Sequence, residues 1–340
     1  MSTRLETRTP AIRGVTRRRS DRWLLAAAVL ICALPAIWGS PLYYGWATTG
    51  LLWAMWTLSL NMVWGTAGQF SLAQLGLGAV SAYTFVLMLD NTDIGPVGAA
   101  LSGIGLAAVA SLAMSVAALR LRNFYFAILT LAFALAITTV FANWELAGRT
   151  SGLLVQRSVL PELSFWRPSV GYGDFYALCA VVFVVAYAAS LFLTRSFAGR
   201  AMQSVRDDEK LASSLGHSPL SIKTLAFVLS GLVAGAAGIL QALYFRLVVP
   251  ELYDTQAILL AVMLLVLAGL GSPAAPLIAG VLYTVLYQVL PVSGESRAGI
   301  LGVIVVLVVV LAPGGIASQG RALLTFVRRR RAGAEKENDV

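Results

Sequence analysis

Long apolar runs, each followed by a short polar or turn-rich segment, recur through most of this 340-residue chain. About 20 apolar residues in a helix are enough to cross the hydrocarbon core of a bilayer, and a helix satisfies its backbone hydrogen bonds within one segment. The pattern therefore predicts an all-α, polytopic membrane protein with about ten transmembrane helices. The charged fraction agrees, because it is 12% here and roughly 25% in a typical soluble domain.

The polar segments divide the chain into expected spans. The turn at Ser40-Pro41 separates the first two, over 23–38 and 42–64. A third helix, ending at Leu89, follows a glycine-rich segment. Further spans are expected over 97–119, 124–144, 175–193, 222–244, 255–270, 276–290 and 298–311. An even number of spans places both termini on the same side of the membrane.

The two ends of the chain differ in character from the apolar part. Residues 1–22 are polar and arginine-rich, and we expect a disordered cytoplasmic N-terminal tail. A cleaved signal peptide is the alternative, which the many later spans and the lack of a small-residue cleavage site disfavour. The transmembrane domain is expected over 23–315, with a cytoplasmic loop at 195–221, and a cytoplasmic C-terminal tail over 316–340.

The distribution of basic residues predicts the orientation. Twenty of the 25 Lys and Arg residues lie in the N-terminal tail, at Arg120 and Arg122, in the 195–223 loop or in the C-terminal tail. The positive-inside rule places these segments in the cytoplasm. The acidic loops at Asp90, Glu251 and Glu295 then lie outside. We therefore expect a multi-pass protein of the cytoplasmic membrane with both termini in the cytoplasm.

The spans carry few chemically reactive side chains. No Asp, Glu, Lys, Arg or His lies in the middle of an expected span. Ion-coupled carriers usually keep such a group there, so that class is disfavoured, whereas a stand-alone channel stays open. The sequence shows no nucleophile–base pair, metal-ligand set or GxxxxGK[ST] motif, so we expect no enzyme, metal or cofactor. Cys32 and Cys179 lie in apolar runs and are expected to be buried free thiols.

An unusual segment, GTAGQFSLAQLGLG, follows the second span at 65–78. It combines Gly, Gln and Ser at membrane depth, where irregular backbone is tolerated only against protein or a water-lined cavity. One interpretation is close helix packing through small residues. The other is that this segment and the end of the preceding span line a substrate path, through Asn61, Gln69, Ser71 and Gln74.

The loop at 195–221 carries signals for both ends of a short helix. Ser204 and Asp207 have the spacing of a capping box, and the acidic residues up to Glu209 would lie in the first turn. Gly216 ends the helix and Pro219 follows. We therefore predict one capped helix between Ser204 and Gly216.

One face of this predicted helix is apolar. Leu211 and Leu215 lie four residues apart and share that face with Ala212. The helix either orders a connection between two spans or docks on a soluble partner. Because the chain has no ATP-binding motif of its own, the second interpretation points to a permease driven by a separate ATPase.

The span that follows contains small residues at regular spacing. Gly231 and Gly235 form a GxxxG pair, and Gly238 continues the row from Ala234. Such rows let two helix backbones approach closely. We expect these glycines to pack this helix tightly against a neighbour.

Several stretches resemble one family. They are GRAMQSVRDDEKLASSLG with the following KTLAFVLSGLVAGAAGIL, GQFSLAQLGLGAVSAYT at 68–84, LRLRNFYFAILTLAFA at 119–134, and the AGLGSPAAPLIAG turn. Together they resemble branched-chain amino acid ABC-transporter permeases, of the longer LivM type, over most of residues 50–315. The chain differs from that family at Ala73-Gln74, where Gly-His is usual, at Ser81, where Gly is frequent, and at Leu211-Ala212, where two alanines are common.

The resemblance implies partners and a coupling site. The partners would be a second permease subunit in a heterodimer, two cytoplasmic ATP-binding subunits and an extracytoplasmic substrate-binding protein, with lipids around the spans and no nucleic acid. The loop would sit in a groove on an ATPase. Its coupling residues would be Arg200, Ser204, Arg206, Asp207, Glu209, Leu211, Ala212, Leu215 and Gly216.

We therefore expect the membrane-spanning permease subunit of an ABC importer for branched-chain or related amino acids, driven by ATP that partner subunits hydrolyse. Relatives of the same architecture for urea, amides or small organic acids are the first alternative. A stand-alone channel or facilitator is the second, and neighbouring genes for ATPases and a binding protein would exclude it.

Overall fold

The computed structural model describes residues 13–38, 40–118, 121, 123–155, 172–216, 218–289, 314–317 and 319. Within these ranges the chain forms a bundle of helices. Its long members are α1 (Arg13–Trp38), α2 (Pro41–Leu60), α3 (Gln74–Asn91), α4 (Gly95–Ala118), α5 (Asn123–Asn143), α7 (Tyr172–Arg195), α10 (Pro219–Phe245), α11 (Thr255–Ala268) and α12 (Ala275–Thr284).

Shorter elements connect the long helices. A π-helix, η1 (Asn61–Thr66), extends α2, and another, η5 (Val285–Val289), extends α12. Two short helices, α8 (Phe197–Asp207) and α9 (Glu209–Ser214), lie between α7 and α10. The 3₁₀ turns are η2 (Glu145–Ala147), η3 (Arg149–Ser151) and η4 (Pro250–Tyr253), and the strands are β1 (Leu153–Leu154) and β2 (Leu247–Val248).

The prediction of an all-α, polytopic membrane protein is confirmed. Five helices in the described ranges are long and apolar enough to cross a membrane, over Gly95–Val116, Phe124–Asn143, Gly173–Arg195, Pro219–Phe245 and Pro250–Ala268. The turn predicted at Ser40-Pro41 is also confirmed, because Ser40 is the N-cap of α2 and Pro41 its first residue. The span expected over 298–311 lies outside the described residues, as do Arg120, Arg122 and Glu295.

One boundary differs from the prediction. The helix α1 begins at Arg13, ten residues before the span expected at 23, so the expectation of a disordered tail up to residue 22 is wrong for its second half. Arginine has a high helix propensity, and an apolar helix that is already formed can extend into such a segment without a new nucleation step.

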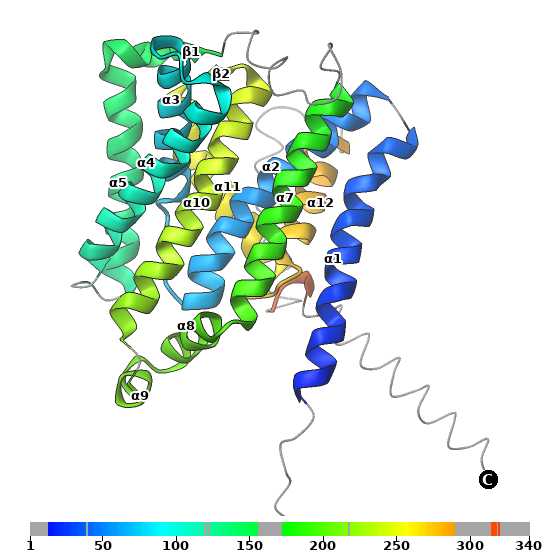
Figure 1. Ribbon diagram of the computed structural model, residues 1–340, viewed down its shortest axis with the longest axis vertical. Coiled ribbons are helices and arrows are strands. Elements are labelled where there is room, and N and C mark those ends of the chain that lie inside the picture. The colour runs from blue at the N-terminus through cyan, green and yellow to red at the C-terminus, as the bar shows by residue number, and fades with distance from the viewer. Residues whose placement is uncertain are drawn as a thin grey trace, which may run out of the picture.

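The central pair of the bundle is α2 and α10. On one side lie α3, α4 and α5, and on the other α7 and then α1, while α11 and α12 pack behind α2 (Figure 1). The α8 and α9 helices and the amino end of α1 lie at one end of the bundle, and the β1–β2 pair lies at the other. The strands are antiparallel, with Leu153 opposite Val248 and Leu154 opposite Leu247.

The row of small residues on α10 lies where this helix meets α3 and α4. A Cβ atom at Gly231 would collide with the Ser111 hydroxyl, and one at Gly238 would collide with the carbonyl oxygen of Gly78. At Gly235 a Cβ would lie 3.1 Å from the Ser81 Oγ. Backbones therefore approach closely along this side of α10, as small residues permit.

The two cysteines are free thiols, as predicted, but the predicted burial holds for Cys179 only. Cys179 is buried and Cys32 is half-buried. The Cys32 carbonyl oxygen accepts a hydrogen bond of 2.8 Å from the Tyr176 hydroxyl, which joins α1 to α7. The hydroxyl of Tyr176 is thereby satisfied within the apolar interior.

Candidate functional site

The glycine-rich segment forms a buried break between two helices. The π-helix η1 ends at Thr66, residues 68–73 have no regular structure, and α3 begins at Gln74. Gly68 has a φ of +73°, which a residue with a side chain rarely adopts. Two amides of this segment are held by other parts of the bundle, because Gln69 donates to the Val63 carbonyl at 3.2 Å and Leu72 donates to the Thr130 hydroxyl at 3.0 Å. These bonds fix the path of the chain through the break.

Asn61 ties this break to the turn between α11 and α12. Its Nδ2 donates to the Ser272 carbonyl oxygen at 3.1 Å, and its Oδ1 accepts from the Gly271 amide at 2.9 Å. A Cβ atom at Gly65 would collide with the Asn61 side chain and lie 2.9 Å from the Gly271 Cα. Both ends of the Asn61 amide are thus used to hold two backbone segments together, and π-helical turns of this kind occur frequently at functional sites.

A second polar cluster lies between α2, α3 and α10. Gln74 Nε2 donates to the Ser230 Oγ at 3.2 Å, and the Ser59 and Ser230 hydroxyls are 3.1 Å apart. Ser59 also donates to the Ser230 carbonyl oxygen at 3.0 Å. All three side chains are completely buried. Ser59 and Ser230 were not predicted as site residues, because their only signal in the sequence was a hydroxyl within each of two apolar spans.

Two of the predicted pathway residues keep an unsatisfied acceptor. Gln69 Oε1 and Gln74 Oε1 are buried and have no hydrogen-bond partner among the described residues. An unsatisfied buried acceptor costs about 1–3 kcal/mol, so such atoms in native proteins usually meet a water, an ion or a ligand. Ser71 differs, because its hydroxyl accepts from the Ala73 amide at 3.3 Å within the break. Among the predicted pathway residues, Gln69 and Gln74 therefore each have an amide oxygen, unpaired within the described chain, that could accept a hydrogen bond from a substrate or a water.

The loop between α7 and α10 contains two helices where one was predicted, so the predicted capping box is wrong. Ser204 lies in the last turn of α8, and its hydroxyl donates to the Arg200 carbonyl oxygen at 3.0 Å. Asp207 is the last residue of α8, where the helix dipole disfavours a negative charge. Ser196 caps α8, and its Oγ accepts from the Gly199 amide at 3.2 Å.

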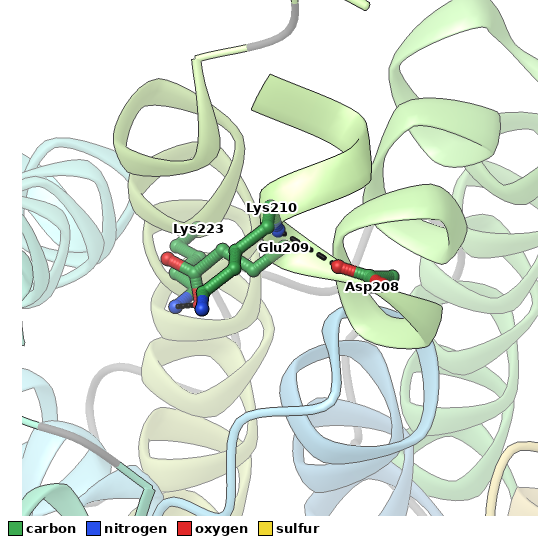
Figure 2. Close-up of polar contacts among 4 residues, drawn as sticks. All are labelled: Asp208, Glu209, Lys210 and Lys223. Atoms are coloured by element: carbon green, nitrogen blue, oxygen red, sulfur yellow. Dashed lines mark hydrogen bonds and ion pairs between the residues drawn. The ribbon is translucent and has the colours of Figure 1, made fainter. Parts of the chain in front are cut away.

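Asp208 begins the second helix. Its backbone is extended, and its Oδ1 accepts from the amides of Lys210 at 2.9 Å and Leu211 at 3.0 Å. Glu209 forms an ion pair of 2.8 Å with Lys223 at the start of α10, as Figure 2 shows. An extended N-cap residue separates α8 from α9, and the ion pair links α9 to the start of α10.

Gly216 ends α9, as predicted. Its φ is +83°, and its amide donates to the Ser213 carbonyl oxygen at 3.0 Å. The three predicted face residues do not lie together, however. Leu211 and Leu215 are 60% and 70% exposed, whereas Ala212 is 1% exposed and faces the bundle. The outward apolar surface of α9 therefore consists of two leucines one turn apart.

Arg206 links α8 to the buried break. Its guanidinium donates to the Gly65 carbonyl oxygen. A Cβ atom at Gly68 would lie 2.7 Å from the Arg206 Cγ, and one at Gly271 would lie 2.8 Å from its guanidinium nitrogen. The signal for this contact in the sequence was two glycines, Gly68 and Gly271, where a Cβ atom would collide with the Arg206 side chain. Arg200 instead donates to the Arg195 carbonyl oxygen at 2.6 Å, within its own loop.

The family comparison agrees with this architecture. The family described as branched-chain amino acid transport system, permease component, matches residues 42–312. The chain belongs to this permease family. It is a family of transport permeases rather than of enzymes, and the chain is a multi-pass membrane protein.

Individual members of the permease family are similar over nearly the whole chain. The high-affinity branched-chain amino acid transport system permease protein LivM of Escherichia coli K12 is 32% identical, over 93% of this chain and 79% of LivM. LivM of Salmonella typhimurium gives the same identity and shares. The LivH permease of E. coli is 26% identical over 79% of this chain and 92% of LivH. No solved structure matches the chain significantly.

Proposed function

We propose that this chain is the membrane-spanning permease subunit of an ABC importer that moves branched-chain or related amino acids across the cytoplasmic membrane. A second permease subunit, of the kind that LivH represents, would complete a heterodimer. Two ATP-binding subunits would supply the energy in the cytoplasm, and a binding protein would deliver the substrate from outside. Membership of the permease family and the similarity to both LivM and LivH support this assignment.

The main structural support for this proposal is the hydrogen bond from Arg206 to the Gly65 carbonyl oxygen. On its outer side the α8–α9 segment presents Leu211 and Leu215 to a partner. On its inner side Arg206 lies against the break that contains Gln69. A movement of α8 that an ATPase imposes on these leucines would therefore shift the Gly65 backbone directly.

Uncoupling by substitution tests the proposal. In proteoliposomes that contain the complete transporter, the Arg206→Ala variant should keep its ATPase subunits bound. Its leucine-stimulated ATP hydrolysis should fall about tenfold, since a hydrogen bond from a charged donor contributes roughly 1.5–3 kcal/mol. Arg206→Lys should fall less, because the charge is kept but the planar guanidinium is lost. Arg149→Ala is the matched control, because Arg149 pairs with Glu145 in a turn outside the α8–α9 segment.

Two outcomes would contradict the proposal. Full stimulation in Arg206→Ala would show that α8 does not transmit the signal through this contact. Uptake of urea, amides or organic acids without uptake of leucine, isoleucine or valine by the unchanged transporter would instead assign the chain to another substrate class of the same architecture.

A further inference from the structure

A cavity lies away from the buried break, between α2, α10, η4, α11, α12 and η5. Its volume is about 380 Å³, within the range of roughly 300–1,000 Å³ that is usual for ligand pockets. Its lining includes Trp53, Gln241, Glu251, Asp254, Tyr283 and Tyr287. The cavity therefore has the size of a small-molecule site and a mixed aromatic and polar wall.

One wall of the cavity is negatively charged. Glu251 lies on the η4 turn, and Asp254 directly precedes α11. The Asp254 Oδ1 accepts from the Ala257 amide at 2.9 Å, which fixes the orientation of this carboxylate. No Lys, Arg or His is among the described residues that line the cavity. Two carboxylates without a basic neighbour in the wall favour a cationic group such as an ammonium.

Another part of the lining is aromatic. The rings of Trp53 and Tyr283 stack with their centroids 5.2 Å apart, and Tyr283 stacks on Tyr287 at 4.7 Å. Stacked rings restrict one another and present a rigid apolar surface. Such a surface accepts an aliphatic side chain, and its faces also attract an ammonium group.

Gln241 supplies a hydrogen-bond donor at the same site. It is 6% exposed, and its Oε1 accepts from the Trp56 Nε1 at 2.8 Å. This bond assigns the oxygen and leaves the amide nitrogen, which has two hydrogens and no hydrogen-bond partner in the described part of the chain. An amide donor that lines a cavity and has no partner within the described residues is suited to a carboxylate ligand.

We infer that this cavity binds a small zwitterionic amino acid with an aliphatic side chain. The ammonium group lies toward Glu251 and Asp254, the carboxylate accepts from the Gln241 amide, and the side chain packs on Trp53 and Tyr283. The inference rests on the function proposed above and names where the substrate first contacts this subunit.

The position of the cavity suits a first contact. It lies near η4 and the carboxyl end of α10, whereas α8 and α9 lie at the opposite end of the bundle (Figure 1). Gln241 and Ser230 are eleven residues apart on α10, which is about 16 Å along the helix. Gln241 at the cavity and Ser230 in the Gln74–Ser230 cluster thus both lie on α10, which packs against α2. The contact between these two helices connects the cavity with the cluster next to the break.

Protection from chemical labelling tests this inference in the complete transporter. Gln256 is exposed and lines the cavity, so Gln256→Cys places a thiol at its rim. Leucine at ten times its half-protecting concentration should slow maleimide labelling about tenfold, since the free fraction falls by that factor. The analogue 4-methylpentanoate lacks the ammonium group and should not protect. Adding Glu251→Gln should abolish protection by leucine, whereas adding Asp93→Asn, an acidic residue outside the cavity, should not.

The outcomes separate this site from the proposed function. If the parent transporter takes up leucine but leucine leaves the labelling rate of Gln256→Cys unchanged, the cavity is not a substrate site, although the function stands. Equal protection by leucine and 4-methylpentanoate would also overturn the inference. If leucine protects but is not transported, the cavity binds amino acids and the proposed import function fails.

Discussion

Gln69 and Gln74 are two of the four described side chains that bury a polar atom without a hydrogen-bond partner. Each buries an amide oxygen without a partner in the described chain, while the Gln74 nitrogen is held by Ser230. Leucine has a similar size and would remove the unsatisfied acceptor. The retention of two amides in an apolar interior is therefore consistent with a role in passing a polar substrate rather than in stability.

Replacing these glutamines separates the two roles. Gln69→Leu and Gln74→Leu should leave folding and subunit association nearly unchanged, since each removes an unpaired buried oxygen along with any bond that is lost. Uptake of leucine in proteoliposomes should fall roughly tenfold in each variant, the equivalent of one lost hydrogen bond to the substrate. Asn143→Leu, at the exposed end of α5, is the control. Unchanged uptake in both variants would leave the break with a packing role alone.

At the scale of elements, α8 and α9 show what sequence patterns do and do not determine. The end of the loop helix at Gly216 was predictable, because a glycine there is free to adopt a positive φ. The start was not, since Ser196, Ser204, Asp207 and Asp208 are all acceptable caps by residue type. Tertiary contacts decide between them. Arg206 packs against the glycines of the break, and Glu209 pairs with Lys223.

The exposed leucines of α9 give a prediction for ATPase binding. Leu215→Asp should release the ATPase subunits during purification, because burying an unpaired charge in an apolar contact costs several kcal/mol. Ser213→Asp adds the same charge to α9 outside the two-leucine surface and should retain them. The measurement is the amount of ATPase that co-purifies with each variant. A Leu215→Asp protein that keeps its ATPase and its stimulated hydrolysis would show that α9 is not the docking element.

Substitutions of the two neighbouring aspartates, Asp207 and Asp208, should differ in their effect on helix stability. Asp208→Ala should weaken α9 by about 0.5–2 kcal/mol, because two amides lose their acceptor. Asp207→Ala should be neutral or slightly favourable, because Asp207 lies at the carboxyl end of α8.

The packing of α10 gives a second prediction at this scale. Gly235→Leu should prevent the close approach of α10 to α4, since even a Cβ atom there lies 3.2 Å from the Ala107 Cβ. Overpacking of this kind costs about 1–3 kcal/mol or more. Gly105→Leu on α4 is the matched control, because a Cβ atom there meets nothing within 4 Å. Thermal unfolding of the purified variants in detergent should show a lowered midpoint for Gly235→Leu only.

At the scale of the whole molecule, the sequence predicted the helices better than the contacts between them. Apolar runs and turn residues such as Ser40 and Pro41 act locally, so the fold class and most boundaries could be derived from them. Asn61 was singled out as a pathway residue, yet it bridges to Gly271 and Ser272, 210 and 211 residues away in the chain. Such partners depend on the packing of α2 against α11 and α12, which no local pattern encodes.

The arrangement of the bundle also bears on its orientation in the membrane. The amino end of α1 and the α8–α9 segment lie at one end, and the β1–β2 pair lies at the other (Figure 1). The first end carries Arg195, Arg200 and Lys210. Because basic residues are retained in the cytoplasm, we expect α8 and α9 to be cytoplasmic and the turn after α3 to be outside.

Cysteine labelling in intact cells tests this orientation at two described positions. Ser213→Cys on α9 should be protected from a membrane-impermeant maleimide, whereas Thr92→Cys, in the turn between α3 and α4, should react. Both positions are exposed, so a difference between them reports the side of the membrane rather than burial. Permeabilising the cells should make Ser213→Cys reactive, which excludes coverage by a bound partner as the cause of protection. Labelling of Ser213→Cys from outside in intact cells would reverse the orientation, and an ATPase in the cytoplasm could then no longer reach Leu211 and Leu215.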